Sequence, residues 1–242
     1  MQSVALKHTP KQKNKENFNK ISKKMKTNYL SNEKMLQNYG AMFENLAKQG
    51  ELKTELAEYG YDDAKIQEGK ALYDKARQTF DDNIKETREE EVSALAFQKK
   101  YQELYQTYIV HRKKARIVFD ENAEALITLK LRGSAARSIA KSIEEMNAFY
   151  QILDTTETLL TPLAQLKIKE QDIKNQLQNL TNVSKLYADY LQEKGESQQA
   201  TMDKNNSFDA LDKWVSKFYK VAKIALEDKP QLLESLGKFV RS

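Results

Sequence analysis

The sequence predicts an all-α fold: two tandem homologous helical-bundle repeats, preceded by a basic N-terminal arm. Only seven glycines and three prolines interrupt 242 residues, which favours long helices over strands and turns. Ala, Leu, Lys, Glu and Gln, which are good helix formers, dominate the composition. The chain also matches itself without a gap when it is shifted so that Arg112 falls on Tyr219; we call this shift the repeat offset.

The internal match is clearest between "RKKARIVFDENAEALITL", residues 112–129, and "YKVAKIALEDKPQLLESL", residues 219–236. Shared positions are mostly apolar, which is what a duplicated core would retain; they include Phe43 with Tyr150 and Ile117 with Ile224. We therefore expect an arm over residues 1–30, a first repeat over 31–136 and a second over 137–242.

The first repeat begins with a helix over about residues 32–48, with a continuation over 51–59. Gly60 can take the left-handed stop conformation, and Asp62 can cap the next helix. Apolar residues then recur three and four apart in two further helices, which is typical of the seams of antiparallel bundles. The two stripes are Ile66, Gly69, Tyr73, Ala76 and Phe80, then Phe97, Tyr101, Leu104, Tyr108, His111, Ala115 and Val118.

Between these stripes, residues 81–92 form a charge run, which indicates a solvated helix surface or a bend between helices. A short last helix is predicted to start at Asp120, and in the second repeat at Asp228 with Pro230 in its first turn. Gly133, at the stop between the repeats, is predicted to end this last helix, and Ser134 or Ser138 to cap the next one.

The segments "EYGYDDAKIQEGKAL", "KKARIVF" and "VAKIALEDKPQLLESLG" are similar to those of a family of uncharacterised bacterial proteins with a duplicated helical domain. The resemblance covers most of residues 30–242 and leaves out the arm. It implies an all-helical fold and a bacterial origin. It implies no activity and no functional residues.

The residue inventory favours a protein without catalytic chemistry. There is no cysteine, no Gly-x-Ser-x-Gly elbow and no glycine-rich phosphate loop, so we expect neither an enzyme nor a bound cofactor. The absence of cysteine, of a signal-peptide core and of a long apolar run predicts a cytoplasmic protein without a transmembrane segment.

The two histidines are His8 and His111, and neither belongs to the Glu-x-x-His pairs of carboxylate-bridged metal sites. His111 occupies the position that Phe218 takes in the other repeat. We expect it to be buried by packing, and His111→Phe to be tolerated or stabilising. The tyrosines of the stripes and Trp214 are likewise expected to pack in the core.

The arm combines charge with an apolar stripe, Phe18, Ile21, Met25 and Tyr29. Residues 1–30 hold eight lysines and one acid, a net charge of +7, whereas residues 31–242 sum to −2. If helical, residues 16–30 form a basic amphipathic segment. Three interpretations stay open: a solvated arm, an arm docked on a neighbouring subunit or another protein, or an electrostatic tether to nucleic acid or an anionic surface.

We predict a non-enzymatic structural or interaction protein, a homo-oligomer or a binder of another protein, with the arm as connector. The alternative is that the lysine-rich arm binds nucleic acid or anionic surfaces. Such binding would be non-specific, because the arm lacks arginine, the better residue for recognising base edges. The candidate partner-binding residues are Lys11, Lys13, Lys15, Phe18, Lys20, Ile21, Lys23, Lys24, Met25 and Tyr29.

Overall fold

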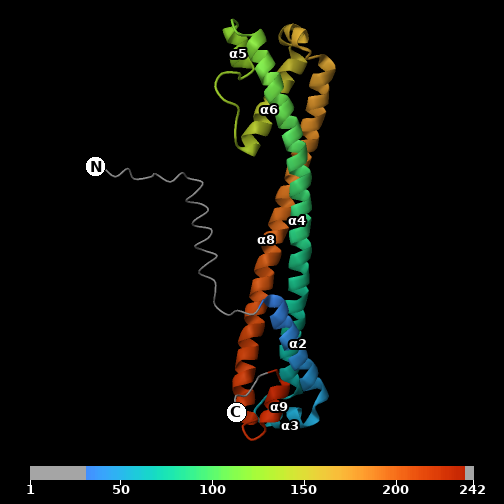
Figure 1. Ribbon diagram of the computed structural model, residues 1–242, viewed down its shortest axis with the longest axis vertical. Helices are drawn as coiled ribbons and strands as arrows, with labels where there is room; N and C mark the ends of the chain where they lie inside the picture. The colour runs from blue at the N-terminus through green and yellow to red at the C-terminus, as the bar shows by residue number, and fades with distance from the viewer. Residues whose placement is uncertain (1–30, 238–242) are drawn as a thin grey trace, which may run out of the picture. The chain divides into compact units, whose positions relative to one another are not determined.

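A computed structural model describes residues 31–237, which form helices joined by turns and contain no strand (Figure 1). This confirms the all-α prediction. The elements in chain order are α2 (Asn32–Lys48), α3 (Gly50–Glu58), α4 (Asp63–Val118), α5 (Ala123–Thr128), α6 (Ile139–Thr155), α7 (Glu157–Leu160), the 3-10 helix η1 (Thr161–Leu166), α8 (Glu170–Ala225) and α9 (Pro230–Ser235).

The described chain divides into two compact units. Unit 1 combines residues 31–77 with residues 210–237, and unit 2 is residues 78–209. Each unit therefore contains helices from both halves of the sequence. The 56-residue helices α4 and α8 contribute one part to each unit.

The core of unit 1 is aromatic. The ring of Trp214 stacks on that of Phe218 at 5.3 Å between centroids and lies 5.7 Å from both Phe43 and Tyr61. Leu52 of α3, in the same unit, is fully buried. Large rings bury much apolar area, and Trp214 packs inside, as predicted.

The core of unit 2 contains buried tyrosines, and the hydroxyls of Tyr101 and Tyr150 are hydrogen-bonded. Tyr108 and Tyr150 are fully buried beside Phe149. The Tyr101 hydroxyl lies 2.7 Å from the buried Ser142 hydroxyl, so a polar group on α4 is satisfied by one on α6. Buried hydroxyls need such partners, because an unpaired polar group in a core costs free energy.

The predicted second and third helices are a single helix, α4, and their counterparts are the single helix α8. The charge run at residues 81–92 neither ends nor interrupts α4. The sequence has no glycine or proline between Gly69 and Gly133, so nothing in α4 after its first turns favours a break. Of the two interpretations of this run, the helix surface is correct.

The first predicted helix ends are confirmed. Gly60 has a φ of 82°, and the backbone N–H of Lys65 donates to the Asp62 carboxylate at 2.9 Å. Pro230 opens α9, as predicted, but Lys229 rather than Asp228 occupies the N-cap position. The prediction for α5 is wrong, because Asn122 rather than Asp120 accepts the capping hydrogen bond, from the N–H of Ala125.

The junction after α5 also differs from the prediction. The helix ends at Thr128, and Gly133, with a φ of 74°, lies beyond it in the connecting segment. Ser138, not Ser134, occupies the N-cap position of α6, without a side-chain capping bond.

His111 and Phe218 are both buried, at 8% and 0% exposure, as predicted. Ile117 and Ile224 are a different case: they match in the internal alignment but are 71% and 61% exposed. Apolar identity at a shared position therefore does not always indicate a core residue in this chain.

Candidate functional site

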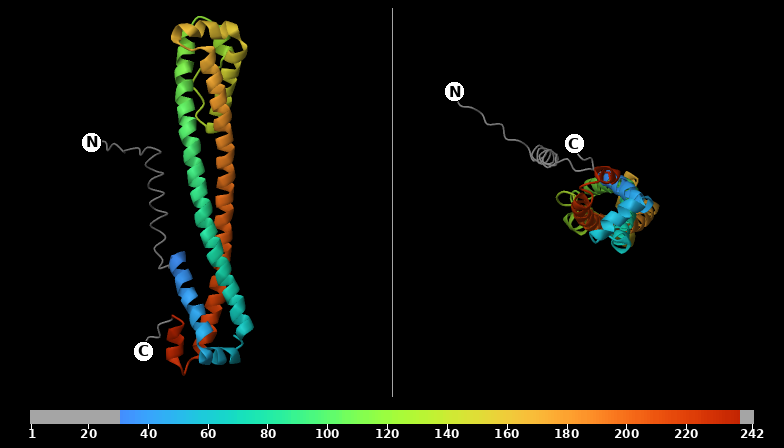
Figure 2. Two further views of the ribbon diagram at one scale, coloured as in Figure 1. Left: turned by 90° about the vertical axis from the view of Figure 1, so that its right-hand side faces the viewer. Right: turned by 90° about the horizontal axis from the view of Figure 1, so that it is seen from below.

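In unit 2, residues 78–118 of α4 and 170–209 of α8 lie side by side (Figures 1 and 2). Asn83 donates to the Thr201 hydroxyl at 3.0 Å and accepts from Lys204 at 2.6 Å. Further along, the ring of Phe97 lies 5.0 Å from that of Tyr187. Rising numbers on α4 thus meet falling numbers on α8, so the two helices are antiparallel.

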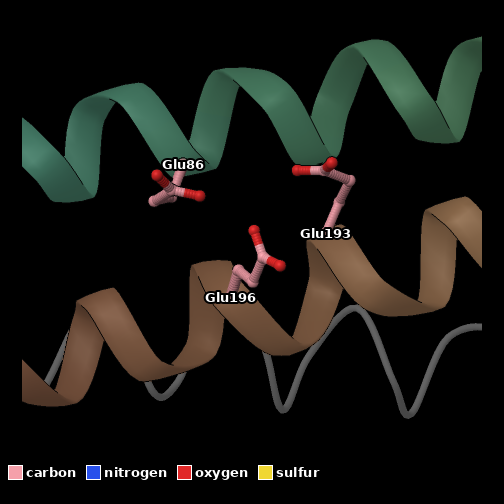
Figure 3. Close-up of side chains that lie close together, drawn as sticks. All are labelled: Glu86, Glu193 and Glu196. Carbon is pink, nitrogen blue, oxygen red and sulfur yellow. The ribbon is translucent and has the colours of Figure 1, made fainter.

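Three glutamates meet between these helices. Glu86 projects from α4 toward Glu193 and Glu196 of α8, as Figure 3 shows. Each can offer a carboxylate oxygen such that all three oxygens lie within 4.8 Å of one another. Like charges at this separation repel, so the pair of helices carries an electrostatic cost here that a cation would relieve.

The cation already present is Lys85, whose Nζ lies 3.0 Å from Glu86 and 3.2 Å from Glu89. These hydrogen bonds raise the pKa of Lys85. One carboxylate oxygen each of Glu86 and Glu193 is buried and has no hydrogen-bond partner among residues 31–237. Burial, and then the charges of Glu196, Glu89 and Glu86, raise the pKa of Glu193.

Carboxylate oxygens are the ligands that Ca²⁺ and Mg²⁺ prefer, but those ions take six or more oxygens. Here Glu86 is engaged by Lys85, and Glu196 is exposed. The cluster is therefore better suited to attracting lysine ammonium groups than to coordinating a metal ion. Sequence reasoning missed it, although a signal exists: Glu86-x-x-Glu89 recurs at the repeat offset as Glu193-x-x-Glu196.

Five large apolar side chains project into solvent from the same stretch of α4 and α8, among them Val92, which is 62% exposed. Ile84 is 43% exposed and Leu95 67%, while Leu191 is 48% and Met202 58% exposed. The repeat offset places Ile84 on Leu191 and Leu95 on Met202. Single exposed apolar residues are ordinary, but recurrence at matching positions of two facing helices indicates a surface.

The four side chains other than Val92 turn toward one side of the helix pair. Ile84 and Met202 each follow a residue of the Asn83–Thr201 contact, and a one-residue step rotates a helix by about 100°. Each rotation has the same sense when viewed along its own chain direction. Because the two chain directions are opposite, both side chains come to the same side of the helix pair. The other pair lies eleven residues along each helix, about three turns, and so on that side too.

Residues 81–95 and 188–202 carry nine acidic and three basic side chains, a net charge of −6 summed around both helix segments. We call the surface formed by Glu86, Glu89, Glu193 and Glu196 the acidic face. By contrast, residues 96–118 of α4 carry one acid and six basic side chains. The negative charge is therefore concentrated in this stretch of the two helices. Glu86 and Glu193, three residues after Asn83 and eight before Thr201, turn to the side of the pair opposite to the exposed apolar side chains.

Other buried polar residues of unit 2 have structural partners. Arg112, 4% exposed, donates to the backbone carbonyls of Lys130, Leu131 and Gly133 and lies 3.6 Å from Glu145. These contacts tie the segment after α5 to α4, and no substrate is needed to explain them.

His111 is also accounted for by packing. Its Nδ1 lies 3.1 Å from the Tyr150 hydroxyl, and its ring meets that of Tyr150 edge-on. Burial lowers the pKa of His111, and the charge of Lys114 lowers it further. The imidazole is therefore kept neutral at pH 7, in the role of a hydrogen-bonded core ring.

All ten candidate partner-binding residues of the arm lie outside the described residues. Within residues 31–237, no helix combines the length and apolar character needed to cross a membrane. Comparison with models of protein families, with curated proteins and with solved structures finds no match to this chain.

Proposed function

We propose that this chain is a non-enzymatic, self-assembling protein whose N-terminal arm joins one copy to another. The observation that carries the proposal is the division of charge along the chain. The arm holds a charge of +7, and residues 81–95 and 188–202 of unit 2 together hold −6. Complementary potentials of this kind favour association and select its partner.

We further propose that the chain arose by duplication of one helical repeat. The repeat offset places both ends of α2, α4 and α5 on the corresponding ends of α6, α8 and α9. The short helix α3 corresponds to α7 with η1, where Pro162 divides the segment. Agreement of these boundaries supports the duplication independently of the residue matches.

Removal of the arm tests the assembly function. Residues 31–242 contain both cores and all described helix caps, so we expect this fragment to fold into a strongly helical species by circular dichroism. Sedimentation should then show concentration-dependent oligomers for the full chain and monomers for the fragment. Oligomers of equal strength in both would contradict the proposal.

The second candidate function is non-specific binding of nucleic acid or an anionic surface through the arm. It is favoured by the eight lysines of residues 1–30, since lysines release counterions from a polyanion without reading its sequence. Retention on heparin that falls steeply with salt, together with a monomeric full chain, would favour this function over self-assembly.

A further inference from the structure

We infer that residues 16–30 dock on their own chain, along the side of α4 and α8 from which Ile84, Leu95, Leu191 and Met202 project; we call it the apolar side. All four residues belong to unit 2, and the acidic face, on the opposite side, takes no part. This docking goes beyond the proposed assembly function, because it gives residues 16–30 a place within a single copy. Residues 1–15, with four of the eight lysines of the arm, then extend past the docked segment toward another copy.

The direction of α2 leads the arm along α4. Within unit 1, an added Cβ on Gly40 would lie 2.7 Å from the Tyr73 hydroxyl, and further along α2 Ala47 lines one cavity with Ile66 of α4. Rising numbers on α2 thus meet falling numbers on α4. Because α2 begins eight residues before Gly40, its start comes level with about the eighth residue of α4 after Tyr73. Residues 16–30 directly precede α2, so a helix formed there continues along α4 from that level.

The apolar side is also the side of α4 on which α2 lies. Tyr73, Ile84 and Leu95 follow one another at steps of eleven residues, about three turns, so they project from one side of the continuous helix α4. Ser31, which caps α2, is in an extended conformation. It shifts the preceding residues by about 2 Å relative to a helical residue, and it lets a helix over residues 16–30 turn its apolar stripe toward this side.

The arm and the apolar side have the same spacing. Phe18 and Tyr29, at the two ends of the apolar stripe, are eleven residues apart, about 16 Å in a helix. Tyr29 precedes Gly40 by eleven residues and Ile84 follows Tyr73 by eleven, so Tyr29 comes level with Ile84. Phe18 then comes level with the exposed apolar side chains one further step of eleven residues along the pair. The two cross-helix pairs that the stripe meets in this way are Ile84 with Met202, and Leu95 with Leu191.

Gly195 leaves room for a third helix between these pairs. It follows Leu191 by four residues and precedes Met202 by seven, and so lies on the same side of α8. An added Cβ there would meet no atom within 4 Å. Glycine is unfavourable in the middle of a helix, and a position without a side chain allows another backbone to approach closely.

The covalent connection favours the arm of the same chain over that of a second copy. Residues 16–30 are separated from α2 by Ser31 alone, which keeps them within reach of the apolar side. A short link of this kind gives an effective concentration on the order of millimolar. A second copy has to reach a comparable concentration to compete.

Cross-linking tests the register, because the chain has no cysteine and introduced pairs react selectively. Phe18→Cys with Leu95→Cys places both thiols at one level. The control, Phe18→Cys with Ile84→Cys, separates them by about 16 Å along α4. Both full-length variants are treated at low concentration with a short bismaleimide and separated on a denaturing gel. We expect a cross-link within one chain, at least about fivefold more abundant in the first variant than in the control.

Trypsin tests whether the apolar side holds the arm. In full-length Leu95→Ser with Met202→Ser, cleavage after the lysines of residues 20–24 should be at least about tenfold faster than in the unchanged protein, because two apolar contacts are lost. The control, Ile117→Ser with Ile224→Ser, changes similarly exposed residues outside the apolar side and should leave the rate unchanged. Cleavage after Lys13, outside the docked segment, is the internal standard.

The outcomes separate this docking from the proposed function. An in-register cross-link within one chain, with faster cleavage in the Leu95 and Met202 variant alone, supports the docking. A cross-link that joins two copies would overturn it and support assembly through the arm. Equal cross-linking of the two cysteine pairs, or none in either, would show that residues 16–30 do not occupy the apolar side. Sedimentation of the unchanged protein judges assembly separately: a monomer with the in-register cross-link keeps the docking and removes the proposed function.

Discussion

Units 1 and 2 contain helices of matching length, but different side chains hold the segments after their short last helices. In unit 2, Arg112 holds the segment after α5 by donating to three backbone carbonyls and pairing with Glu145. In unit 1 the position that matches Arg112 is Tyr219, whose hydroxyl donates to the carbonyl of Leu236 at 2.6 Å. One guanidinium thus does in unit 2 what a phenol does in unit 1.

The packing of the facing helices differs in the same way. Trp214 fits against Gly69 in unit 1, where an added Cβ would lie 2.4 Å from the indole. The matching positions in unit 2 are Thr107 and Gln176, which line a small polar cavity of about 90 Å³. The indole of Trp214 fills the space between the facing helices in unit 1, whereas unit 2 has a cavity at the matching positions.

The buried pair His111–Tyr150 of unit 2 is replaced in unit 1 by Phe218 and Phe43. Each pair is self-consistent, since a buried imidazole and phenol satisfy one another and two phenyl rings need no polar partner. The comparison shows that the apolar stripes specify the helices in both units. The side-chain pairs that connect the helices can differ between the units if both members of a pair change together.

The largest expected effect is at Arg112. Its change to Ala leaves three carbonyls without this donor and Glu145 without its cation, and removing one partner of a buried ion pair costs about 3–5 kcal/mol. Tyr219→Phe in unit 1 removes one hydrogen bond and should cost about 1 kcal/mol. Urea unfolding followed by circular dichroism measures both; equal losses would remove the contrast between the units.

Gly69→Ala tests the aromatic seam of unit 1. The new methyl group would overlap Trp214, and overpacking of this kind costs about 1–3 kcal/mol. The matched control, Gln176→Ala in unit 2, lies beside a cavity and should change the free energy of unfolding by less than about 0.5 kcal/mol. A stable Gly69→Ala protein with unchanged tryptophan fluorescence would contradict the described packing.

The structure revises the expectation for His111→Phe. Because the Tyr150 hydroxyl would lose its partner in the core, we now expect the single change to cost about 1–3 kcal/mol at pH 7. Adding Tyr150→Phe, which reproduces the pair of unit 1, should recover part of that loss. A single variant as stable as the unchanged protein would mean that the hydrogen bond contributes little.

The same residue predicts a pH dependence. The folded pKa of His111 is lowered, chiefly by burial, so below about pH 6.5 the unfolded chain binds a proton that the folded one resists. Stability should therefore fall between pH 7 and pH 5, and less steeply in the double Phe variant. Parallel thermal melts over this pH range measure the difference; identical slopes would show that His111 titrates normally.

The smallest effect concerns the carboxylates of the acidic face. The raised pKa of Glu193 means that its ionised form is disfavoured in the folded state. Glu193→Gln should therefore stabilise the protein at pH 7, and the gain should vanish as the pH falls toward the usual glutamate value.

Glu103 is the matched control for this change, because a hydrogen bond from Lys100 lowers its pKa. Glu103→Gln should destabilise slightly at pH 7 and lose that effect in acid. If the two variants shift the melting temperature in the same direction at pH 7, the repulsion described for the acidic face is absent.

Much of the fold follows from the sequence because the apolar stripes repeat every three to four residues and the caps are local. The burial of His111, the turn at Gly60 and the cap at Asp62 depend on neighbouring residues and were predictable. The continuity of α4 depends on the absence of glycine and proline after Gly69. Such an absence is a weaker signal than a periodic apolar stripe. The recurrence of Glu-x-x-Glu at the repeat offset was a signal for the acidic face, but its assembly was not predictable, since that requires knowing that Glu86 and Glu193 meet across antiparallel helices.

The most direct test of assembly through the arm is sedimentation equilibrium of two full-length variants in about 0.15 M salt, where exposed charges are screened within ~8 Å. Phe18→Ser with Ile21→Ser should weaken self-association more than Lys23→Gln with Lys24→Gln, because a docked arm buries its apolar stripe. A larger effect of the lysine pair that disappears at high salt would make the arm an electrostatic tether. No effect of either pair would contradict the assembly function itself.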